Sequence, residues 1–206
     1  MTPAYNVIKN NYLIANYQSS MCVDNDDGSA FYRIHDNVCA YGGHKSDFDG
    51  HHKYTYNSLD IFPKKDACVR TMPMFSADGV DAYYNNSCMM LGEGNGQPGA
   101  VGAGPYAAFS ACQNKTLRYS EQLITLHENT VYLDEDKFGK PMVACSDFLP
   151  PWGAALKVDL ATWQKMYKTS AINTTVVGTL PTPDTMAAMA RAILGLGSGS
   201  DAFMTE

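Results

Sequence analysis

The sequence predicts an all-β fold in which short strands stack as the coils of a β-solenoid. Short β-rich segments recur, each reaches an asparagine, and a second short apolar segment follows. The pattern occupies residues 7–14, 32–39, 54–61, 82–88 and 126–132. Asn37 follows Asn11 by 26 residues, Asn57 follows Asn37 by 20, and Asn86 follows Asn57 by 29. Such periods, closed by a residue that tolerates a left-handed backbone, are typical of solenoid corners. An ordinary β-sandwich with asparagine in its turns is the alternative.

Three consecutive regions follow from this pattern. Residues 1–150 are expected to form the coils, interrupted at residues 92–104 by the glycine-rich loop GEGNGQPGAVGAG. Glycine favours irregular backbone there, and Pro98 blocks regular strand pairing. Residues 151–196 are expected to form a helical C-terminal cap, and residues 197–206 a flexible tail.

Two helices are predicted within the cap. Asp159 can cap a short helix that runs through Trp163 and Tyr167. Thr182 can cap a second helix, with Pro183 at its first position. This second helix carries one apolar stripe at helical spacing, formed by Met186, Met189, Ala190, Ile193 and Leu194. The last coil of a solenoid exposes unpaired backbone groups, so we expect this helix to cover that open end.

Bulk properties exclude two classes of partner. The 206 residues suffice for one sizeable domain, and 15 Lys+Arg against 21 Asp+Glu give a formal charge of −6. That charge offers no footprint for nucleic acid. The longest apolar run, residues 187–196, is interrupted by Arg191 and is far shorter than the roughly 20 residues of a membrane-spanning helix. We therefore expect no nucleic acid, no membrane insertion and a monomer.

Cysteines and glycosylation sequons favour an extracellular protein. The chain has six Cys and no CxxC, and it has sequons at Asn85, Asn114 and Asn173. Together these predict a secreted glycoprotein with disulfides. Six cysteines allow 15 pairings, among which the sequence does not choose. No signal peptide is visible in MTPAYNVIKNNYL, so the chain is either cytosolic or missing its front end.

Several runs of residues resemble a known group of proteins. These are NDDGSAFYRIHDN, KSDFDGH, the pair WQ at residues 163–164, and P-x-x-D-T-x-x-x-x-A-R-x-x-L-G-L near the end. As a set they resemble extracellular right-handed parallel β-helix proteins, broadly similar to pectin-lyase-like folds, over residues 6–196. The resemblance is to the C-terminal part of such proteins, which carry more coils upstream. It implies polysaccharide chemistry, by β-elimination or by hydrolysis.

One segment, residues 22–57, concentrates the candidate chemistry. It contains six aspartates and four histidines, namely Asp24, Asp26, Asp27, Asp36, Asp47, Asp49, His35, His44, His51 and His52. Asp26 and Asp47 are 21 residues apart, about one coil, and neighbouring strands lie roughly 4.8 Å apart. We therefore expect the two acidic clusters to stack. Stacked carboxylates repel, so the pKa of one should rise unless a cation or Lys45 lies between them.

Three roles for these clusters stay open. A glycoside hydrolase would use two carboxyl groups as acid and base. A lyase would bind Ca²⁺ through Asp24, Asp26 and Asp47, while Lys45 or Arg33 removes the proton next to a uronate carboxylate. The catalytic candidates are Asp26, Asp27, Asp47, Asp49, Lys45 and His51. In the third reading the acids only form turns in a non-catalytic carbohydrate-binding or structural module. The leading hypothesis is an extracellular enzyme that acts on polysaccharide, and the non-catalytic module is the alternative.

Other sites find less support in the sequence. An EF-hand starting at Asp24 would place His35 where glutamate is required. Zinc is disfavoured because His51 and His52 are adjacent and would point to opposite faces of a strand. His35 and His127 are expected to be structural. Tyrosines at 54, 56, 83 and 84 are expected to divide between core and surface, because Tyr is both a strand former and a sugar-binding residue.

Overall fold

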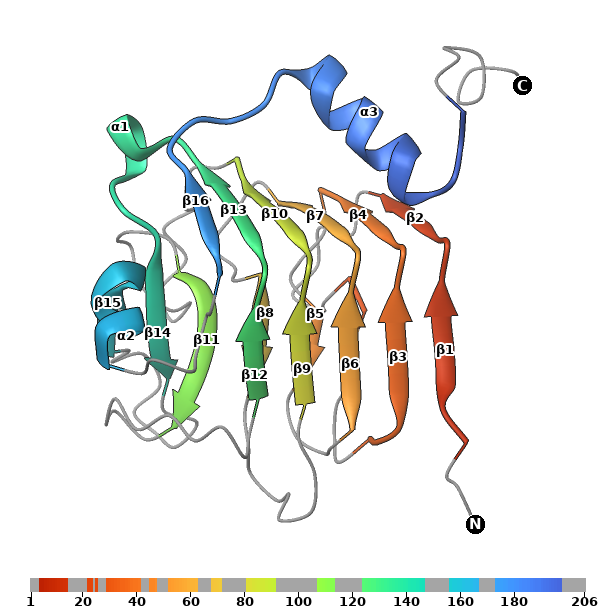
Figure 1. Cartoon of the computed structure of the whole chain (residues 1–206), viewed down its shortest axis with the longest axis horizontal. Coiled ribbons are helices and arrows are strands. Elements are labelled where there is room, and N and C mark those ends of the chain that lie inside the picture. The colour runs from red at the N-terminus through yellow and green to blue at the C-terminus, as the bar shows by residue number, and fades with distance from the viewer. Residues whose placement is uncertain are drawn as a thin grey trace.

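The fold is mostly β, as predicted. The computed structural model describes residues 4–14, 22–23, 25, 29–41, 45–47, 52–62, 68–71, 81–91, 107–113, 124–146, 156–166 and 173–197. The strands form three sheets, which we call A, B and C (Figure 1). Sheet A contains β1 (Asn6–Lys9), β3 (Tyr32–His35), β6 (Lys53–Tyr56), β9 (Asp81–Tyr84) and β12 (Ile124–His127). Sheet B contains β2 (Tyr12–Ile14), β4 (Val38–Ala40), β7 (Leu59–Phe62), β10 (Ser87–Met90), β13 (Thr130–Leu133) and β16 (Thr175–Val177). Sheet C contains β5 (Lys45–Asp47), β8 (Val69–Thr71), β11 (Ala107–Gln113), β14 (Met142–Ser146) and β15 (Leu156–Asp159).

The chain visits the sheets in a repeating order. From β3 to β14 it runs from sheet A to sheet B to sheet C and back to sheet A, beside the strand it left one pass earlier. Before that, β1 and β2 belong to sheets A and B, and after β14 the chain continues with β15 in sheet C and β16 in sheet B. We call each pass a coil, starting from its strand in sheet A. All described strand pairs are parallel except β14 with β15, which is antiparallel. This arrangement is compatible with the predicted solenoid.

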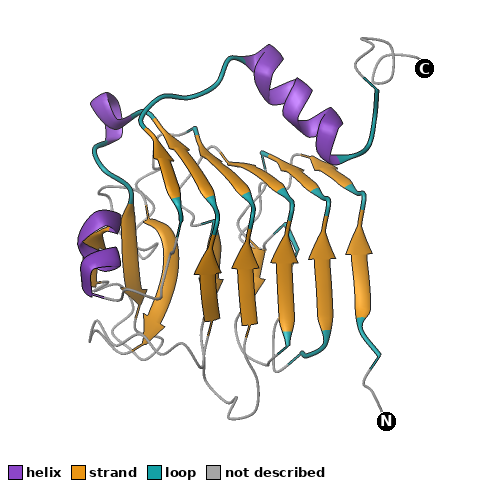
Figure 2. Ribbon diagram, viewed as in Figure 1, coloured by secondary structure: helices purple, strands orange, loops and turns teal. Residues whose placement is uncertain are grey.

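A two-residue corner joins each of the five strands of sheet A to the next strand of sheet B, and a sixth corner of the same form precedes β16 of sheet B (Figure 2). The first corner residue has a left-handed backbone, with φ between 50° and 57°, at Asn10, Asp36, Asn57, Asn85, Glu128 and Asn173. Asparagine and aspartate tolerate this conformation better than most residues. The second corner residue is Asn11, Asn37, Ser58, Asn86, Asn129 or Thr174. The expected series Asn11, Asn37, Asn57, Asn86 is therefore wrong at one member, because Ser58 and not Asn57 is equivalent to Asn37.

The core lies between the sheets. Its most completely buried large side chains are Tyr83, Ile34, Met90, Leu126 and Leu133, with Trp163 from the C-terminal region. Leu59 and Met89 are equally buried but lie on the outer face of sheet B. Two disulfides, Cys22–Cys39 and Cys68–Cys88, each join one coil to the next. Burial of these apolar side chains supplies the main stabilisation of the fold.

Two short helices flank the last coil. Helix α1 (Glu135–Phe138) is capped by Asp134, whose side chain accepts from the amide of Lys137. Helix α2 (Leu160–Met166) begins after Asp159, whose Oδ1 accepts from the amide of Thr162 at 2.9 Å, as predicted. Trp163 of α2 is fully buried, and the helix packs against β14 and β15.

Helix α3 (Pro183–Ile193) has the predicted N-cap and apolar stripe, but it lies at a different position from the one predicted. Thr182 Oγ1 accepts from the amide of Thr185, and Pro183 is the first helical residue. The stripe packs on the outer face of sheet B, in one cluster with Val38, Leu59, Ile61, Met89 and Leu91. Figure 1 shows α3 lying along sheet B. The expectation that this helix covers the open end is therefore wrong, because the outer face of sheet B is itself apolar and needs cover.

Two predicted segments fall outside the described residues. They are the glycine-rich loop at residues 92–104 and all of the tail except Gly197, which is exposed. Among the described helices, none is both long enough and apolar enough to cross a lipid bilayer.

Candidate functional site

The outer face of sheet A is built by alternation along its strands. On β6, Lys53 and Thr55 are buried, whereas Tyr54 and Tyr56 are half-buried. Successive residues of a strand point to opposite faces, so Tyr54 and Tyr56 point outward. In-register parallel pairing aligns the outward residues of neighbouring strands in rows across the sheet.

Four rings in register form what we call the aromatic row, which is His35, Tyr56, Tyr84 and His127. Neighbouring ring centroids lie 4.7, 5.0 and 4.8 Å apart, with interplanar angles of 5°, 12° and 8°. Aromatic pairs contribute about 0.5–1.5 kcal/mol each beyond their buried area. Tyr56 and Tyr84 are covered on both ring faces, so solvent reaches their edges.

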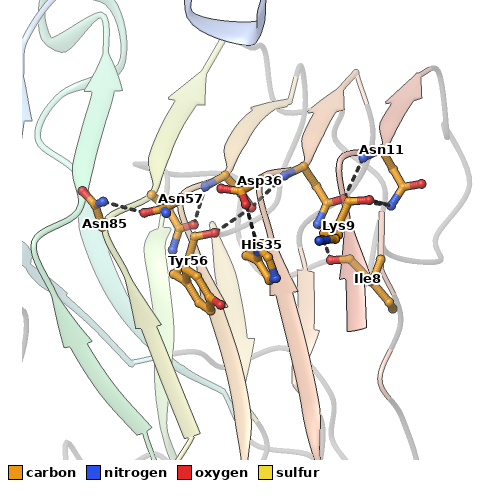
Figure 3. A network of polar contacts seen from close by, with 11 residues as sticks. Ile8, Lys9, Asn11, His35, Asp36, Tyr56, Asn57 and Asn85 are labelled. Carbon is orange, nitrogen blue, oxygen red and sulfur yellow. Dashed lines mark hydrogen bonds and ion pairs between the residues drawn. The ribbon is translucent and has the colours of Figure 1, made fainter. Parts of the chain in front are cut away.

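A carboxylate accompanies each end of the aromatic row. Nδ1 of His35 lies 2.6 Å from Oδ2 of Asp36 (Figure 3). Nδ1 of His127 lies 3.4 Å from Oε2 of Glu128. Both carboxylates belong to left-handed corner residues, so the backbone of the corner places them beside the rings. Between them, Asn85 Nδ2 donates to Asn57 Oδ1 at 2.6 Å, which links two further corners (Figure 3).

A second group of side chains lies toward the starts of the first sheet A strands. The guanidinium carbon of Arg33 lies 4.6 Å from the ring centroid of Tyr5, a cation–π contact. The Tyr5 ring lies 5.8 Å from that of Tyr54 and 5.7 Å from that of Phe31. Phe31 in turn stacks on His52 at 5.0 Å. This group and the aromatic row together are called the aromatic face below.

The pKa values of Tyr54 and Tyr84, two tyrosines of the aromatic face, are raised, so both stay protonated at neutral pH. Burial raises the pKa of Tyr54, and a hydrogen bond with Tyr5 adds to that rise. Burial also raises the pKa of Tyr84, with a contribution from Tyr56. A protonated tyrosine hydroxyl both donates and accepts hydrogen bonds. The aromatic face therefore presents neutral hydroxyls beside the exposed cation Arg33.

A ladder of second corner residues holds the coils in register. The amide N–H of Asn86 donates to Oδ1 of Asn129 at 3.1 Å, and the amide N–H of Ser58 donates to Oδ1 of Asn86 at 3.0 Å. The side-chain amides return these bonds, since Asn129 Nδ2 donates to the carbonyl of Tyr83 and Asn86 Nδ2 to that of Thr55. Asn11 and Asn37 repeat this pattern in the first two coils. The ladder fixes the spacing at which the rings of the aromatic row stack.

A buried hydrogen bond fixes sheet A to sheet B behind the aromatic row. Tyr83, next to Tyr84, points inward, and its hydroxyl donates to Oδ2 of Asp60 on β7 at 2.9 Å. Both residues are almost completely buried. Burial and the Asp60 carboxylate raise the pKa of Tyr83 well above its ordinary value. The hydroxyl therefore remains a donor across the physiological range.

The predicted catalytic and calcium-binding residues are only partly placed. Lys45 and Asp47 lie on β5, opposite Val69 and Thr71 of β8. The others, Asp24, Asp26, Asp27, Asp49 and His51, lie outside the described residues. Within the described part of the chain, no three His, Cys, Asp or Glu side chains gather as a metal site would require. Asn25 stands between Asp24 and Asp26 in the sequence, and its buried Oδ1 has no hydrogen-bond partner among the described residues.

Two of the three predicted glycosylation sites fall at corners. Asn85 and Asn173 are exposed left-handed residues, and Asn114 lies outside the described residues. The acceptor nitrogen of Asn85 is the one that donates to Asn57. Exposure of a sequon asparagine is what a surface glycan requires.

Sequence reasoning missed the aromatic row as a unit. The predicted division of the tyrosines is confirmed, because Tyr83 is buried while Tyr54, Tyr56 and Tyr84 lie on the surface. His35 and His127 were expected to be structural, and the two histidines stack on the tyrosines. A signal was present, since the residue before each left-handed corner from the second coil to the fifth is His or Tyr.

The aromatic face presents ring edges, hydroxyl groups and the guanidinium of Arg33 in a regular array. Searches of protein-family models, of curated proteins and of solved structures find no match to this chain.

Proposed function

We propose that this protein binds a linear polysaccharide along the outer face of sheet A. The aromatic row carries the proposal, because its rings repeat every 4.7 to 5.0 Å along one line. The sugar units of an extended polysaccharide also repeat along one line. A periodic surface can therefore make the same contact with successive units.

The chemistry of the aromatic face suits a sugar ligand. Tyrosine and histidine edges with the Arg33 guanidinium supply donors for hydroxyl and carboxylate oxygens. The asparagine ladder and the Tyr83–Asp60 hydrogen bond hold these groups rigidly, so binding loses little conformational entropy.

The wider proposal is an extracellular right-handed parallel β-helix that acts as a carbohydrate-binding module. Two disulfides between coils and two exposed sequon asparagines support the oxidising compartment. A polysaccharide lyase or glycoside hydrolase using Asp26, Asp27, Asp47, Asp49, Lys45 and His51 stays a prediction. A Ca²⁺ site formed by Asp24, Asp26 and Asp47 also stays a prediction. The Oδ1 of Asn25, which has no partner among the described residues, is a further oxygen that could ligate the ion.

The binding test uses the double variant Tyr56→Phe/Tyr84→Phe, which keeps the stacked rings and removes their hydroxyls. A hydrogen bond contributes about 1 kcal/mol, so we expect roughly 10-fold to 30-fold weaker binding. Binding is measured by affinity electrophoresis and calorimetry on acidic and neutral polysaccharides, with and without Ca²⁺. Tyr41→Phe is the matched control, because Tyr41 is exposed away from sheet A.

Two results would contradict the proposal. One is that the wild-type protein binds no polysaccharide of the panel. The other is that the double variant and Tyr41→Phe bind as the wild type does. The same incubations are assayed for unsaturated products and new reducing ends, beside Asp26→Asn/Asp47→Asn. Products that this second variant abolishes would establish catalysis in addition to binding.

A further inference from the structure

Two cysteines in the last two coils are register partners. Cys112 lies on β11 and Cys145 on β14, and the register of this parallel pair sets them opposite each other. The other four of the six cysteines form the Cys22–Cys39 and Cys68–Cys88 bridges. The two that remain are therefore on neighbouring strands.

The backbone spacing suits a disulfide. Neighbouring strands lie about 4.7–4.9 Å apart, and disulfides span Cα–Cα distances of about 4.4–6.8 Å. The two described bridges span 6.2 and 5.8 Å. Register partners on parallel strands also belong to the same face of the sheet.

An irregularity of β11 creates this juxtaposition. Ser110 pairs with Ala144, and the next registered pair is Cys112 with Cys145. One extra residue, Ala111, is thus accommodated on β11, as in a β-bulge. In an unbroken register Ala111 would lie opposite Cys145.

From this placement we propose that Cys112 and Cys145 form a third disulfide, which joins the fourth coil to the fifth. Two S–H bonds break and one S–S bond forms, with the loss of two protons and two electrons. The electrons pass to the disulfide of an oxidised dithiol carrier, which becomes a dithiol. The same class of oxidant forms the two described bridges.

The proposal completes a pattern that does not depend on the polysaccharide hypothesis. Cys22–Cys39 joins coils one and two, and Cys68–Cys88 joins coils three and four. The third bridge would join coils four and five, and no thiol would be left. A fully oxidised set of six cysteines is typical of secreted proteins.

Peptide mapping of the full chain tests the proposal. The protein is secreted from a eukaryotic host, alkylated without reduction, and digested with trypsin and chymotrypsin so that Cys88 and Cys112 fall on different peptides. We expect no alkylated cysteine and a cross-linked peptide that contains Cys112 and Cys145. Alkylation at these two positions in protein that carries the other two bridges would overturn it, and so would a bridge from Cys112 or Cys145 to any of the other four cysteines.

Thiol titration of variants gives an independent readout. Cys112→Ser and Cys145→Ser should each expose one titratable thiol, at the other position of the pair, and Cys112→Ser/Cys145→Ser should expose none. The double variant leaves no unpaired thiol, which protects its folding from wrong pairing. A thiol at Cys22, Cys39, Cys68 or Cys88 in either single variant would contradict the proposed pairing.

Discussion

Left-handed backbone at the sheet A to sheet B corner constrains the residue that stands there. Four of the six positions are asparagine and one is aspartate, residues that visit this region at low cost. Glu128, with φ of 57°, is the exception. Its side chain is 57% exposed, and its only described partner is His127 at 3.4 Å. Among these corners, the one at Glu128 therefore has the residue least suited to a left-handed backbone.

Glu128→Gly should raise the free energy of unfolding by about 0.5–1 kcal/mol. Glycine adopts a left-handed backbone without strain, and an exposed ion pair contributes little. Urea denaturation followed by circular dichroism measures the change. Glu128→Ala is the control, since it removes the same carboxylate and keeps the strain. Equal stability of Glu128→Gly and Glu128→Ala would contradict the proposed backbone strain.

Tyr83→Phe should lower the free energy of unfolding by about 1–3 kcal/mol at neutral pH, because the buried Asp60 loses its donor. The pKa of Tyr83 is raised well above its ordinary value by burial and by Asp60. The unfolded chain ionises near pH 10, so the contribution of Tyr83 is full below that pH and declines above it.

The difference between wild type and Tyr83→Phe should therefore narrow as the pH rises above about 10. Urea midpoints at neutral pH and about pH 10.5 measure it, with the exposed Tyr41→Phe as control. A difference that stays constant or widens with pH would contradict a raised pKa for Tyr83.

At the scale of elements, the corner ladder sets the register of the strands, as a tight hairpin turn does in an antiparallel sheet. Each strand of sheets A and B has only three or four residues, too few for an independent strand pair. The ladder links backbone and side-chain amides of successive coils through buried bonds, as between Asn86 and Asn129. The strands thus stay in register because their corners are tied to each other.

Asn86→Ala should destabilise the protein by about 2–4 kcal/mol. The change removes the acceptor for the amide of Ser58 and the donor to the carbonyl of Thr55, both buried. Chemical denaturation gives the size of the loss. Asn6→Ala, at an exposed position of β1, should change stability by less than about 0.5 kcal/mol. A similar small effect of both changes would mean that the ladder does not stabilise the coils.

At the scale of the whole molecule, α3 closes one side of the coils and leaves another open. Its apolar stripe covers the outer face of sheet B, while the aromatic face of sheet A has no helix over it among the described residues. The side that is left uncovered is the one that carries the proposed ligand contacts.

Ala190→Glu tests the position of α3. Ala190 is buried against sheet B, so a carboxylate there should cost about 2–4 kcal/mol of stability. Ala188→Glu, on the exposed side of the same helix, should be nearly neutral. Thermal unfolding of both variants gives the comparison. If Ala188→Glu were the more destabilising change, the packing of α3 on sheet B would be wrong.

Local sequence signals predicted the helices and their caps correctly, but they did not predict which elements pack against each other. The caps at Asp159 and Thr182 and the apolar stripe of α3 are confirmed, because each depends on residues a few positions apart. The place of α3 was wrong, because it depends on an apolar outer face that residues from β4, β7 and β10 build together. The aromatic row was missed for the same reason, since only the register of four strands brings its members into contact.

Unequal spacing of the ladder has a consequence for tracing ancestry. Successive ladder bonds join residues 26, 21, 28 and 43 positions apart in the chain. The length of chain between corners therefore varies while the corners keep their form. Distant homologues should be sought by aligning the short signature of ring, left-handed residue and amide, with gaps left free between copies. A search that assumes a constant repeat length would pass over them.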